Sequence, residues 1–158
     1  KNILIVHENF LQIFSLELRT NQRNFKGSKA PIKNIAFSSQ GRLISQTNID
    51  GSTCVWNAFT TKAISNLPFD SAITVMQFSP NSNYLAIGDT DCNLSIIDIN
   101  SDSIVHRFKN INSSISSIIF SPNSRYLLVS SQQDSKIAVI ELNWDIHFLQ
   151  TSSQTIHK

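Results

Sequence analysis

A block of about 41 residues recurs along this chain of 158 residues, and a period of that length restricts the fold to a few repeat architectures. The segment FSPNSNYL, which begins at Phe78, returns as FSPNSRYL at Phe120. A weaker copy, FSSQGRL, begins at Phe37. Isoleucines and aspartates keep nearly the same step, namely Ile32, Ile73 and Ile115, and Asp50, Asp91 and Asp134. This agreement at independent positions indicates a true internal repeat.

Each repeat divides into four short apolar segments separated by turn residues. The segments are too short for helices and carry little helical period, so they predict β-strands. The Ser-Pro-Asn-Ser sequences fall between the first and second segments, where proline presets φ and serine and asparagine bond nearby backbone groups. The chain is rich in isoleucine and only 15% of its residues are charged, which suits many buried strands.

The units have definite bounds. Residues 30–69, 71–110 and 113–151 each hold four segments, and residues 152–158 form a tail. Residues 1–29 hold only three segments, which correspond to the second, third and fourth of the other units. The register supports this alignment, because Phe14 lies one repeat before Trp56. We therefore expect one partial and three complete units of a single domain.

The repeat resembles the WD-repeat family, whose blades end their third strand with Trp-Asp. The matching pairs here are Trp56-Asn57, Ile97-Asp98, Ile140-Glu141 and Phe14-Ser15. The family's turn aspartate is present before the third strand in each full unit, as Asp50, Asp91 and Asp134. The family's Gly-His pair is degraded, with Gly27-Ser28 keeping only the glycine and with Phe69 and Ile111 at histidine positions.

The resemblance implies an all-β fold, a segment of a WD-repeat β-propeller made of four-stranded antiparallel blades. Fewer than four blades leave two uncovered end faces, so the propeller is expected to be incomplete and residues 1–158 alone not to form a stable soluble monomer. The rest of the propeller, or another propeller segment, would complete it. Phe37, Phe78 and Phe120 are expected to be buried between blades. Without the histidines, the family's Trp–Ser/Thr–His–Asp hydrogen-bond network cannot form fully.

The residues capable of catalysis do not fall into a catalytic pattern. His7, His106, His147 and His157 have no metal-ligand spacing, and the four glycines form no phosphate loop. Cys54 lies in a buried strand and is expected to be inert. We therefore predict no enzyme, no cofactor and no metal. Two cysteines without a disulfide framework favour an intracellular site, cytoplasm or nucleus, and no apolar run is long enough to span a membrane.

Between Arg19 and Ile49 the chain has six basic residues and no acidic one: Arg19, Arg23, Lys26, Lys29, Lys33 and Arg42. Such a stretch can contact the phosphates of RNA or an acidic protein, or can be a solvated edge. Asp50, Asp91 and Asp134 are interpreted as structural residues of their own turns. Trp144 follows the third strand of the last unit, where it either contacts a partner or tucks beneath its own blade.

The leading functional prediction is a non-catalytic protein-interaction scaffold within a multi-subunit assembly. The alternative is an RNA-associated propeller of a ribonucleoprotein or ribosome-assembly particle that uses the basic stretch 19–42. Propellers present the loops between fourth and first strands, and between second and third strands, to partners. Candidate partner-binding residues are Lys29, Lys33, Asn48, Asp70, Asp89, Asn112, Gln132 and Trp144.

Overall fold

A computed structural model describes residues 2–26, 29–109, 111, 114–131, 137–142 and 146–149. Fifteen strands and no helix are found in these ranges, and the strands form four antiparallel sheets. The predicted all-β fold class is therefore confirmed. In the part of the chain that the structure describes, no helix is long and apolar enough to cross a membrane.

Each sheet is built from consecutive strands in sequence order. Sheet one has three strands, β1 (Asn2–Val6), β2 (Phe10–Ser15) and β3 (Thr20–Lys26). Sheet two contains β4 (Ile32–Phe37), β5 (Leu43–Asn48), β6 (Ser52–Asn57) and β7 (Ala63–Pro68). Sheet three contains β8 (Ile73–Phe78), β9 (Tyr84–Asp89), β10 (Leu94–Asp98) and β11 (Ser103–Phe108). Sheet four contains β12 (Ile115–Phe120), β13 (Tyr126–Ser131), β14 (Ile137–Glu141) and β15 (Ile146–Leu149).

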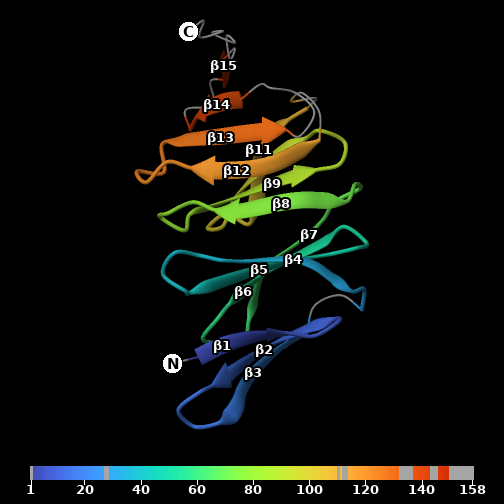
Figure 1. Ribbon diagram of the computed structural model, residues 1–158, viewed down its shortest axis with the longest axis vertical. Coiled ribbons are helices and arrows are strands. Elements are labelled where there is room, and N and C mark those ends of the chain that lie inside the picture. Colours follow the sequence, from blue (N-terminus) through green and yellow to red (C-terminus); the bar gives the residue numbers. More distant parts are fainter. Residues whose placement is uncertain are drawn as a thin grey trace, which may run out of the picture.

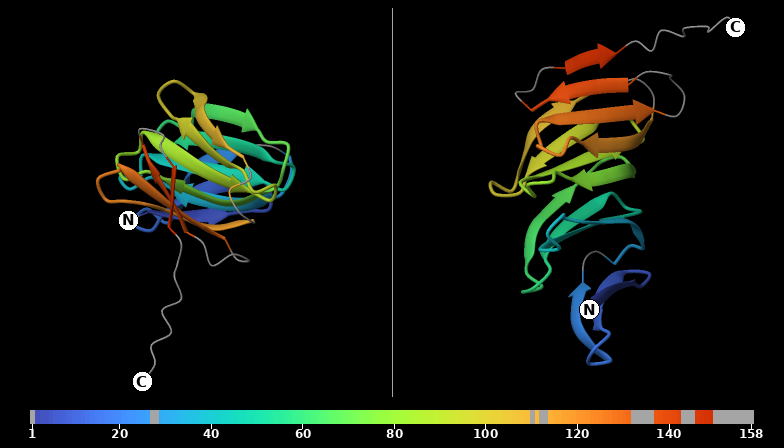
Figure 2. Two further views of the ribbon diagram at one scale, coloured as in Figure 1. Left: turned by 90° about the horizontal axis from the view of Figure 1, so that it is seen from above. Right: turned by 60° about the vertical axis from the view of Figure 1, so that its left-hand side comes forward.

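The four sheets follow one another along the long axis of the molecule, from sheet one near the N-terminus to sheet four near the C-terminus (Figure 1). The stack is curved, and neighbouring sheets are rotated relative to one another (Figure 2). The first strands β4, β8 and β12 lie against one another in succession. Sheet one has no such strand, because β1 corresponds to the second strand of the other sheets and forms the edge of its sheet.

The strands end at two opposite faces of the stack. The crossover face carries the connections between successive sheets and the turns between second and third strands. The hairpin face carries the turns between first and second strands and between third and fourth strands. A six-residue strand spans about 20 Å, which sets the approximate separation of the two faces.

The turn between the first and second strands is the same in the three four-stranded sheets. A serine hydroxyl accepts a hydrogen bond from the first N–H of the second strand, with 3.0 Å from Leu43 N to Ser38, 2.9 Å from Tyr84 N to Ser79 and 2.8 Å from Tyr126 N to Ser121. One residue of each turn has a positive φ, and these are Gly41, Ser82 and Ser124. This local bonding explains why the Ser-Pro-Asn-Ser sequences are turns, as predicted.

Three apolar clusters occupy the junctions between the sheets. Leu11, Phe25 and Trp56 are in the cluster between sheets one and two. Val55, Phe78 and Ile97 belong to the cluster at sheets two and three, and Leu94, Phe120 and Ile140 to the cluster at sheets three and four. Because strand side chains alternate between the two faces of a sheet, β6 supplies both of its neighbours, with Trp56 on one side and Val55 on the other.

The expectation that three equivalent phenylalanines are buried is correct for two of them and wrong for Phe37. Phe78 and Phe120 are 5% and 6% exposed, whereas Phe37 is 48% exposed. Phe78 is covered by a cluster that includes Ala36 of the first strand of sheet two. No first strand of sheet one is present to cover Phe37 in the same way.

Gly27-Ser28, the degraded Gly-His pair of the unit that contains Trp56, lies outside the described residues. The indole Nε1 of Trp56 is buried and has no hydrogen-bond partner among the described residues. Phe69 and Ile111, which stand at the histidine positions, are buried in the clusters of the neighbouring junctions. Packing therefore replaces part of the missing hydrogen-bond network.

Apolar side chains are exposed on the outer faces of the two end sheets. Ile119, Leu128 and Ile137 are exposed on sheet four, and Ile3 is exposed on sheet one. In the middle sheets the corresponding faces are covered by a neighbouring sheet. The outer faces of the two end sheets thus leave apolar side chains uncovered in the described structure.

Candidate functional site

A polar hollow of about 160 Å³ opens on the crossover face between sheets two and three. Its walls come from the connection after β7, the turn after β9 and the end of β11. The lining residues are Phe69, Asp70, Ser71, Asp89, Asp91, Asn93, Arg107 and Lys109. The hollow therefore brings three carboxylates and two cationic side chains together, and it includes two of the predicted partner-binding residues.

Two of the charged side chains in this crossover hollow are fixed by bonds within the protein. The Asp89 carboxylate accepts hydrogen bonds from the backbone N–H groups of Asp91 and Asn93, both at 2.9 Å, and from the Asn93 side chain. Arg107 donates from Nε to Ser95 Oγ at 3.2 Å, and its guanidinium carbon lies 5.8 Å from the centre of the Phe69 ring. These groups form a preorganised wall.

The other three charged side chains of the hollow are exposed. Among the described residues, Asp70, Asp91 and Lys109 form no ion pair. Exposed charges at a concave site can pair with a bound molecule without first breaking an internal bond. The hollow thus offers charges of both signs to a polar ligand.

A larger groove, of about 430 Å³, lies on the hairpin face between the same two sheets. Its lining includes apolar side chains, amides and one guanidinium. The lining residues are Gln40, Arg42, Leu43, Asn57, Ile64, Asn81, Ser82, Asn83, Ile99 and Asn100. This hairpin groove contains no carboxylate, which distinguishes it from the crossover hollow.

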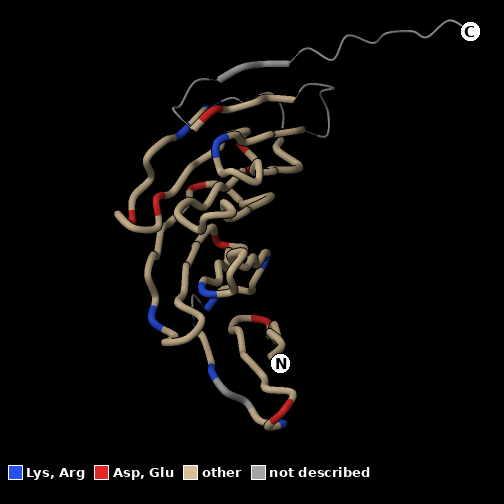
Figure 3. Tube along the Cα trace, turned by 90° about the vertical axis from the view of Figure 1, so that its left-hand side faces the viewer, with Lys and Arg blue, Asp and Glu red and all other residues tan. Residues whose placement is uncertain are grey.

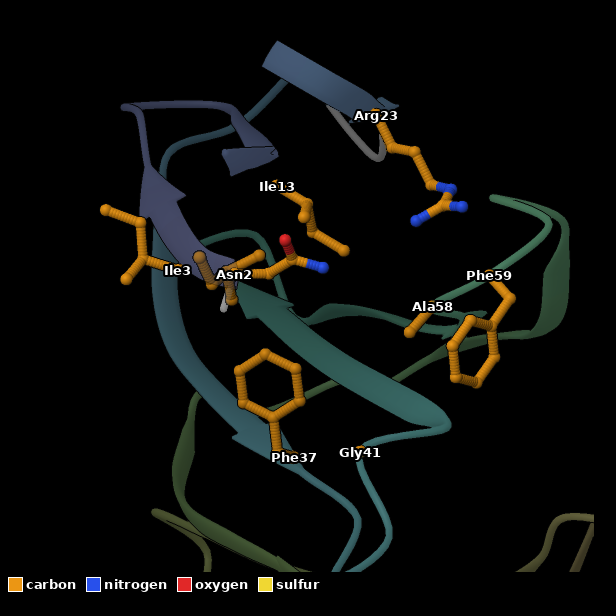
Figure 4. A pocket seen from close by; sticks show the side chains of 9 residues that line it. Asn2, Ile3, Ile13, Arg23, Phe37, Gly41, Ala58 and Phe59 are labelled. Carbon is orange, nitrogen blue, oxygen red and sulfur yellow. The ribbon is translucent and has the colours of Figure 1, made fainter. Parts of the chain in front are cut away.

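An apolar cleft of about 130 Å³ lies where sheet one meets sheet two (Figure 4). Phe37 and Ile13 face this cleft from the two sheets, and Phe59 and Arg23 stand at its side. Phe59 is 59% exposed and occupies the turn position at which the next repeat has Asn100. The cleft lies beside β1, the edge strand of sheet one in the described structure.

The predicted partner-binding residues divide into surface and interior positions. Lys29, Lys33 and Asp70 are exposed on the crossover face. Asn48 is fully buried, so the expectation that it contacts a partner is wrong. Its side chain instead accepts a hydrogen bond from Gln46 at 2.9 Å and donates one to Ser52 Oγ at 2.9 Å.

The turn aspartates also differ in what they do. The Asp50 carboxylate accepts hydrogen bonds from the backbone N–H and the hydroxyl of Ser52, at 3.0 and 2.6 Å, as a structural turn residue would. In the next sheet the carboxylate that organises the turn belongs to Asp89, and the exposed Asp91 contributes its backbone N–H. The residue predicted for partner contact thus has the structural role there.

The basic stretch does not form a single patch. Arg19 and Arg42 lie in turns of the hairpin face, whereas Lys26, Lys29 and Lys33 lie at the crossover face. Arg23 lies in β3, between these two faces, and lines the apolar cleft between sheets one and two. The basic segments are accordingly dispersed along the chain trace (Figure 3).

Four predicted site residues lie outside the described residues, namely Asn112, Gln132, Asp134 and Trp144. Several residues that line the sites were not singled out from the sequence. Arg107 and Lys109 line the crossover hollow, and Phe59 lines the junction cleft. The signal for Phe59 was available, because it is an aromatic residue where the repeat otherwise has asparagine.

The described residues give little support for reactive chemistry. Among them, no group of three or more His, Cys, Asp or Glu side chains is placed to hold a metal ion. Cys54 is buried, and burial, followed by the nearby Asp50 carboxylate, raises the pKa of its thiol. A raised pKa lowers the thiolate fraction, so this cysteine is a poor nucleophile.

Two family models match the sequence. The model described as "Anaphase-promoting complex subunit 4 WD40 domain" matches residues 68–147. The model described as "WD domain, G-beta repeat" matches residues 19–57. The first match includes sheet three, most of sheet four and the crossover hollow, and the second includes β3 and the first three strands of sheet two.

Proposed function

Because this chain belongs to the WD40-repeat family, we propose that it is a non-catalytic protein-interaction scaffold within a multi-subunit assembly. WD40 domains generally act as platforms for protein–protein contacts. The family description that covers half of the chain names a subunit of the anaphase-promoting complex. We propose membership of an assembly of that kind for this chain.

The observation that carries the proposal is the crossover hollow between sheets two and three. Its exposed charges, Asp70, Asp91 and Lys109, are free of internal ion pairs in the described structure. Charged side chains of both signs at a concave surface give specificity for a partner of complementary charge. Most residues of the hollow lie in turns and connections, so its exposed charges can vary without disturbing the sheets.

The exposed apolar end faces support a second part of the proposal. Ile119 and Leu128 on sheet four and Ile3 on sheet one have no covering sheet in the described structure. We propose that further propeller blades, from the rest of the protein or from another propeller segment, cover these faces. A neighbouring sheet would bury them as the middle sheets are buried.

The arrangement of the basic residues favours proteins over RNA as the partners. RNA binding draws its affinity from several phosphates neutralised at once by a continuous basic surface. Here the basic residues are divided between two opposite faces, with Arg42 on one and Lys29 and Lys33 on the other. The crossover hollow adds carboxylates next to Arg107 and Lys109, which would repel phosphates.

Native mass spectrometry of the intact protein, purified from its own cells at low and at moderate salt, tests the proposal. We expect stoichiometric protein partners that remain bound at moderate salt. The double variant Asp70→Ala and Asp91→Ala should lose at least one partner, while the distant surface variant Lys62→Ala should keep the full set. A protein that remains without stoichiometric protein partners at both salt concentrations would overturn the proposal.

A further inference from the structure

The hairpin groove has a chemical character that the scaffold role does not by itself explain. It is the largest of the three hollows described above, and its volume of about 430 Å³ lies within the usual range of ligand sites, about 300–1,000 Å³. None of its ten lining residues is acidic. The groove therefore combines apolar side chains with amide and guanidinium groups and has no carboxylate in its lining.

The surplus of donors follows from how the asparagines are used. The Oδ1 atom of Asn57 accepts hydrogen bonds from the N–H groups of Phe59 and Thr60, at 2.9 and 3.0 Å. The Oδ1 atom of Asn81 accepts from Ser79 Oγ at 2.7 Å and from the Asn83 N–H at 3.1 Å. Within the described residues, neither Nδ2 atom donates a hydrogen bond. In each amide the Oδ1 acceptor is thus used within the protein, and the Nδ2 donors are free to bond a ligand.

Arg42, the guanidinium of the groove, lacks in the described structure the carboxylate partner that the equivalent arginine has in sheet four. Arg125 occupies the position in sheet four that Arg42 occupies in sheet two. Arg125 pairs with Glu141, at 2.8 Å from Nε and 2.7 Å from Nη2 to Oε1, and this hydrogen bond raises the pKa of its guanidinium. Asn57 stands where Glu141 would be, because Leu43 pairs with Asn57 as Tyr126 pairs with Glu141.

Arg42 is therefore exposed without a carboxylate partner. Among the described residues it forms neither an ion pair nor a side-chain hydrogen bond. The same repeat position that is neutralised internally in sheet four is left cationic in sheet two. An anionic group from outside the chain would complete it, with the planar fork of the guanidinium suited to a carboxylate.

We propose that the hairpin groove binds an extended, acidic segment of a partner protein, with a carboxylate of that segment paired to Arg42. The amide donors of Asn57 and Asn81 would hold backbone carbonyl groups, and the apolar side chains of Leu43, Ile64 and Ile99 would contact an aliphatic side chain. This proposal rests on the scaffold function and specifies the chemistry of one partner. It concerns a different face from the crossover hollow.

The lining favours a peptide over a nucleic acid. Arg42 is the single cationic side chain of the groove, and no aromatic side chain lines it. Binding of single-stranded RNA relies on several cations along the backbone and on aromatic stacking of the bases. A lining of aliphatic side chains and amides instead matches the alternating side chains and regular carbonyl groups of an extended peptide.

The test measures binding of a fluorescein-labelled peptide, Ser-Glu-Leu-Glu-Leu-Ser, to the intact protein by fluorescence polarisation. The matched probe Ser-Gln-Leu-Gln-Leu-Ser has the same shape without charge, and a six-nucleotide oligouridine is the RNA probe. We expect the acidic peptide to bind about tenfold more tightly than the neutral one, because hydrogen bonds to charged groups are the stronger ones. Oligouridine should bind more weakly than either peptide.

Two variants locate the site and a third controls for charge. Arg42→Gln and Asn57→Asp should each weaken binding of the acidic peptide by about tenfold, the second by placing a carboxylate beside Arg42. Asn57→Asp keeps the turn, since Asp98 accepts the equivalent backbone hydrogen bonds in sheet three. Arg125→Gln removes one positive charge elsewhere and should leave the affinity unchanged.

Three results would overturn the inference. They are no binding of the acidic peptide at millimolar concentration, equal losses in Arg42→Gln and Arg125→Gln, or oligouridine binding that is tighter than peptide binding and depends on Arg42. The scaffold function is judged separately by native mass spectrometry. If partners remain bound while the peptide fails to bind, only this inference falls. If the peptide binds but no partner is found, only the scaffold proposal falls.

Discussion

The junction between sheets one and two and the junction between sheets two and three are made from the same repeat positions, yet only the second is closed. At the closed junction Phe78 is 5% exposed in a cluster that includes Ala36 of the preceding first strand. At the open junction Phe37 is 48% exposed and lines a cleft. The difference teaches that burial in a repeat protein depends on the neighbouring unit more than on the residue itself.

The largest expected contrast between the junctions is the loss of a phenylalanine side chain. Phe78→Ala should lower the free energy of unfolding by about 3–5 kcal/mol, because it leaves a cavity in a packed cluster. Phe37→Ala should cost only about 1–2 kcal/mol if the side chain is as exposed in the intact protein as it is in the described structure, where about half of it faces solvent. Urea denaturation of the intact protein measures both. Equal losses would mean that the first junction is as closed as the second.

A smaller contrast is expected from two glycines with positive φ. A Cβ added at Gly51 would clash with the backbone carbonyl oxygen of Phe69, at the closed junction. A Cβ added at Gly41 would meet no atom within 4 Å. Gly51→Ala should therefore cost about 2–4 kcal/mol, through backbone strain and overlap. Gly41→Ala should cost about 1 kcal/mol from φ alone.

Denaturation of the two alanine variants in parallel checks this ranking. Because the φ values, 81° for Gly51 and 65° for Gly41, are both in the left-handed region, the conformational term is similar in the two. The excess cost at Gly51 then reports the overlap at the closed junction. A larger loss at Gly41 would show that the cleft is narrower than described.

The Asn57→Asp substitution tests the difference between Arg42, which has no carboxylate partner in the described structure, and Arg125, which has one. It offers Arg42 the carboxylate that Arg125 already has in Glu141. The expected gain is small, a rise of at most about 3 °C in Tm, because exposed ion pairs contribute little. Scanning calorimetry at low and high salt measures it. A rise that persists at high salt would contradict a surface ion pair, and a fall would show that the amide nitrogen of Asn57 has an internal role.

The smallest expected effect is the pH dependence of stability that comes from Cys54, and it tests whether solvent entering the cleft at the first junction reaches the apolar cluster. Cys54 belongs to the cluster behind the cleft, and burial raises the pKa of its thiol. Its folded pKa then exceeds the unfolded value, so its contribution to stability is complete below about pH 8.5 and is lost as the pH rises through the folded pKa. The free energy of unfolding should fall slightly in that range.

Thiol labelling checks the same point. Cys54 should react with a maleimide much more slowly than the partly exposed Cys92. Phe37→Ala should leave the labelling rate of Cys54 nearly unchanged, because Phe37 lines the cleft whereas Cys54 lies in the apolar cluster behind it. The Cys54→Ser variant isolates the rate of Cys92. Fast labelling of Cys54 in the unchanged protein would mean that solvent reaches the cluster.

The fold could be predicted because the step of the repeat fixes strand number and turn position with little dependence on distant residues. The alternation of Trp56 and Val55 and the serine-led turns are local consequences of sequence. The exposure of Phe37 could not be read in the same way, since it depends on a strand that sheet one does not have. Local information sufficed wherever the neighbour was itself a complete repeat.

The sites were less accessible to sequence reasoning than the fold. Asn48 was expected at the surface because it lies at the connection between the second and third strands, but its side chain is buried and bonded to Gln46 and Ser52. The hairpin groove depends on which residue lies across the ladder from Arg42, and that requires the register of β5 and β6. With that register, a comparison of Arg42 and Asn57 with Arg125 and Glu141 identifies the unpaired charge.

The succession of first strands from β4 through β8 to β12 also sets how the molecule exchanges its amide hydrogens. Each sheet is held by its neighbours in the stack, so the free energy of local opening is shared between adjacent sheets and not over the whole chain. Sheets two and three, each packed on both sides, are expected to retain their amide protons longer than sheets one and four, whose outer faces are uncovered in the described structure. Hydrogen exchange of the intact protein would show faster exchange in sheets one and four only where no further blade covers them.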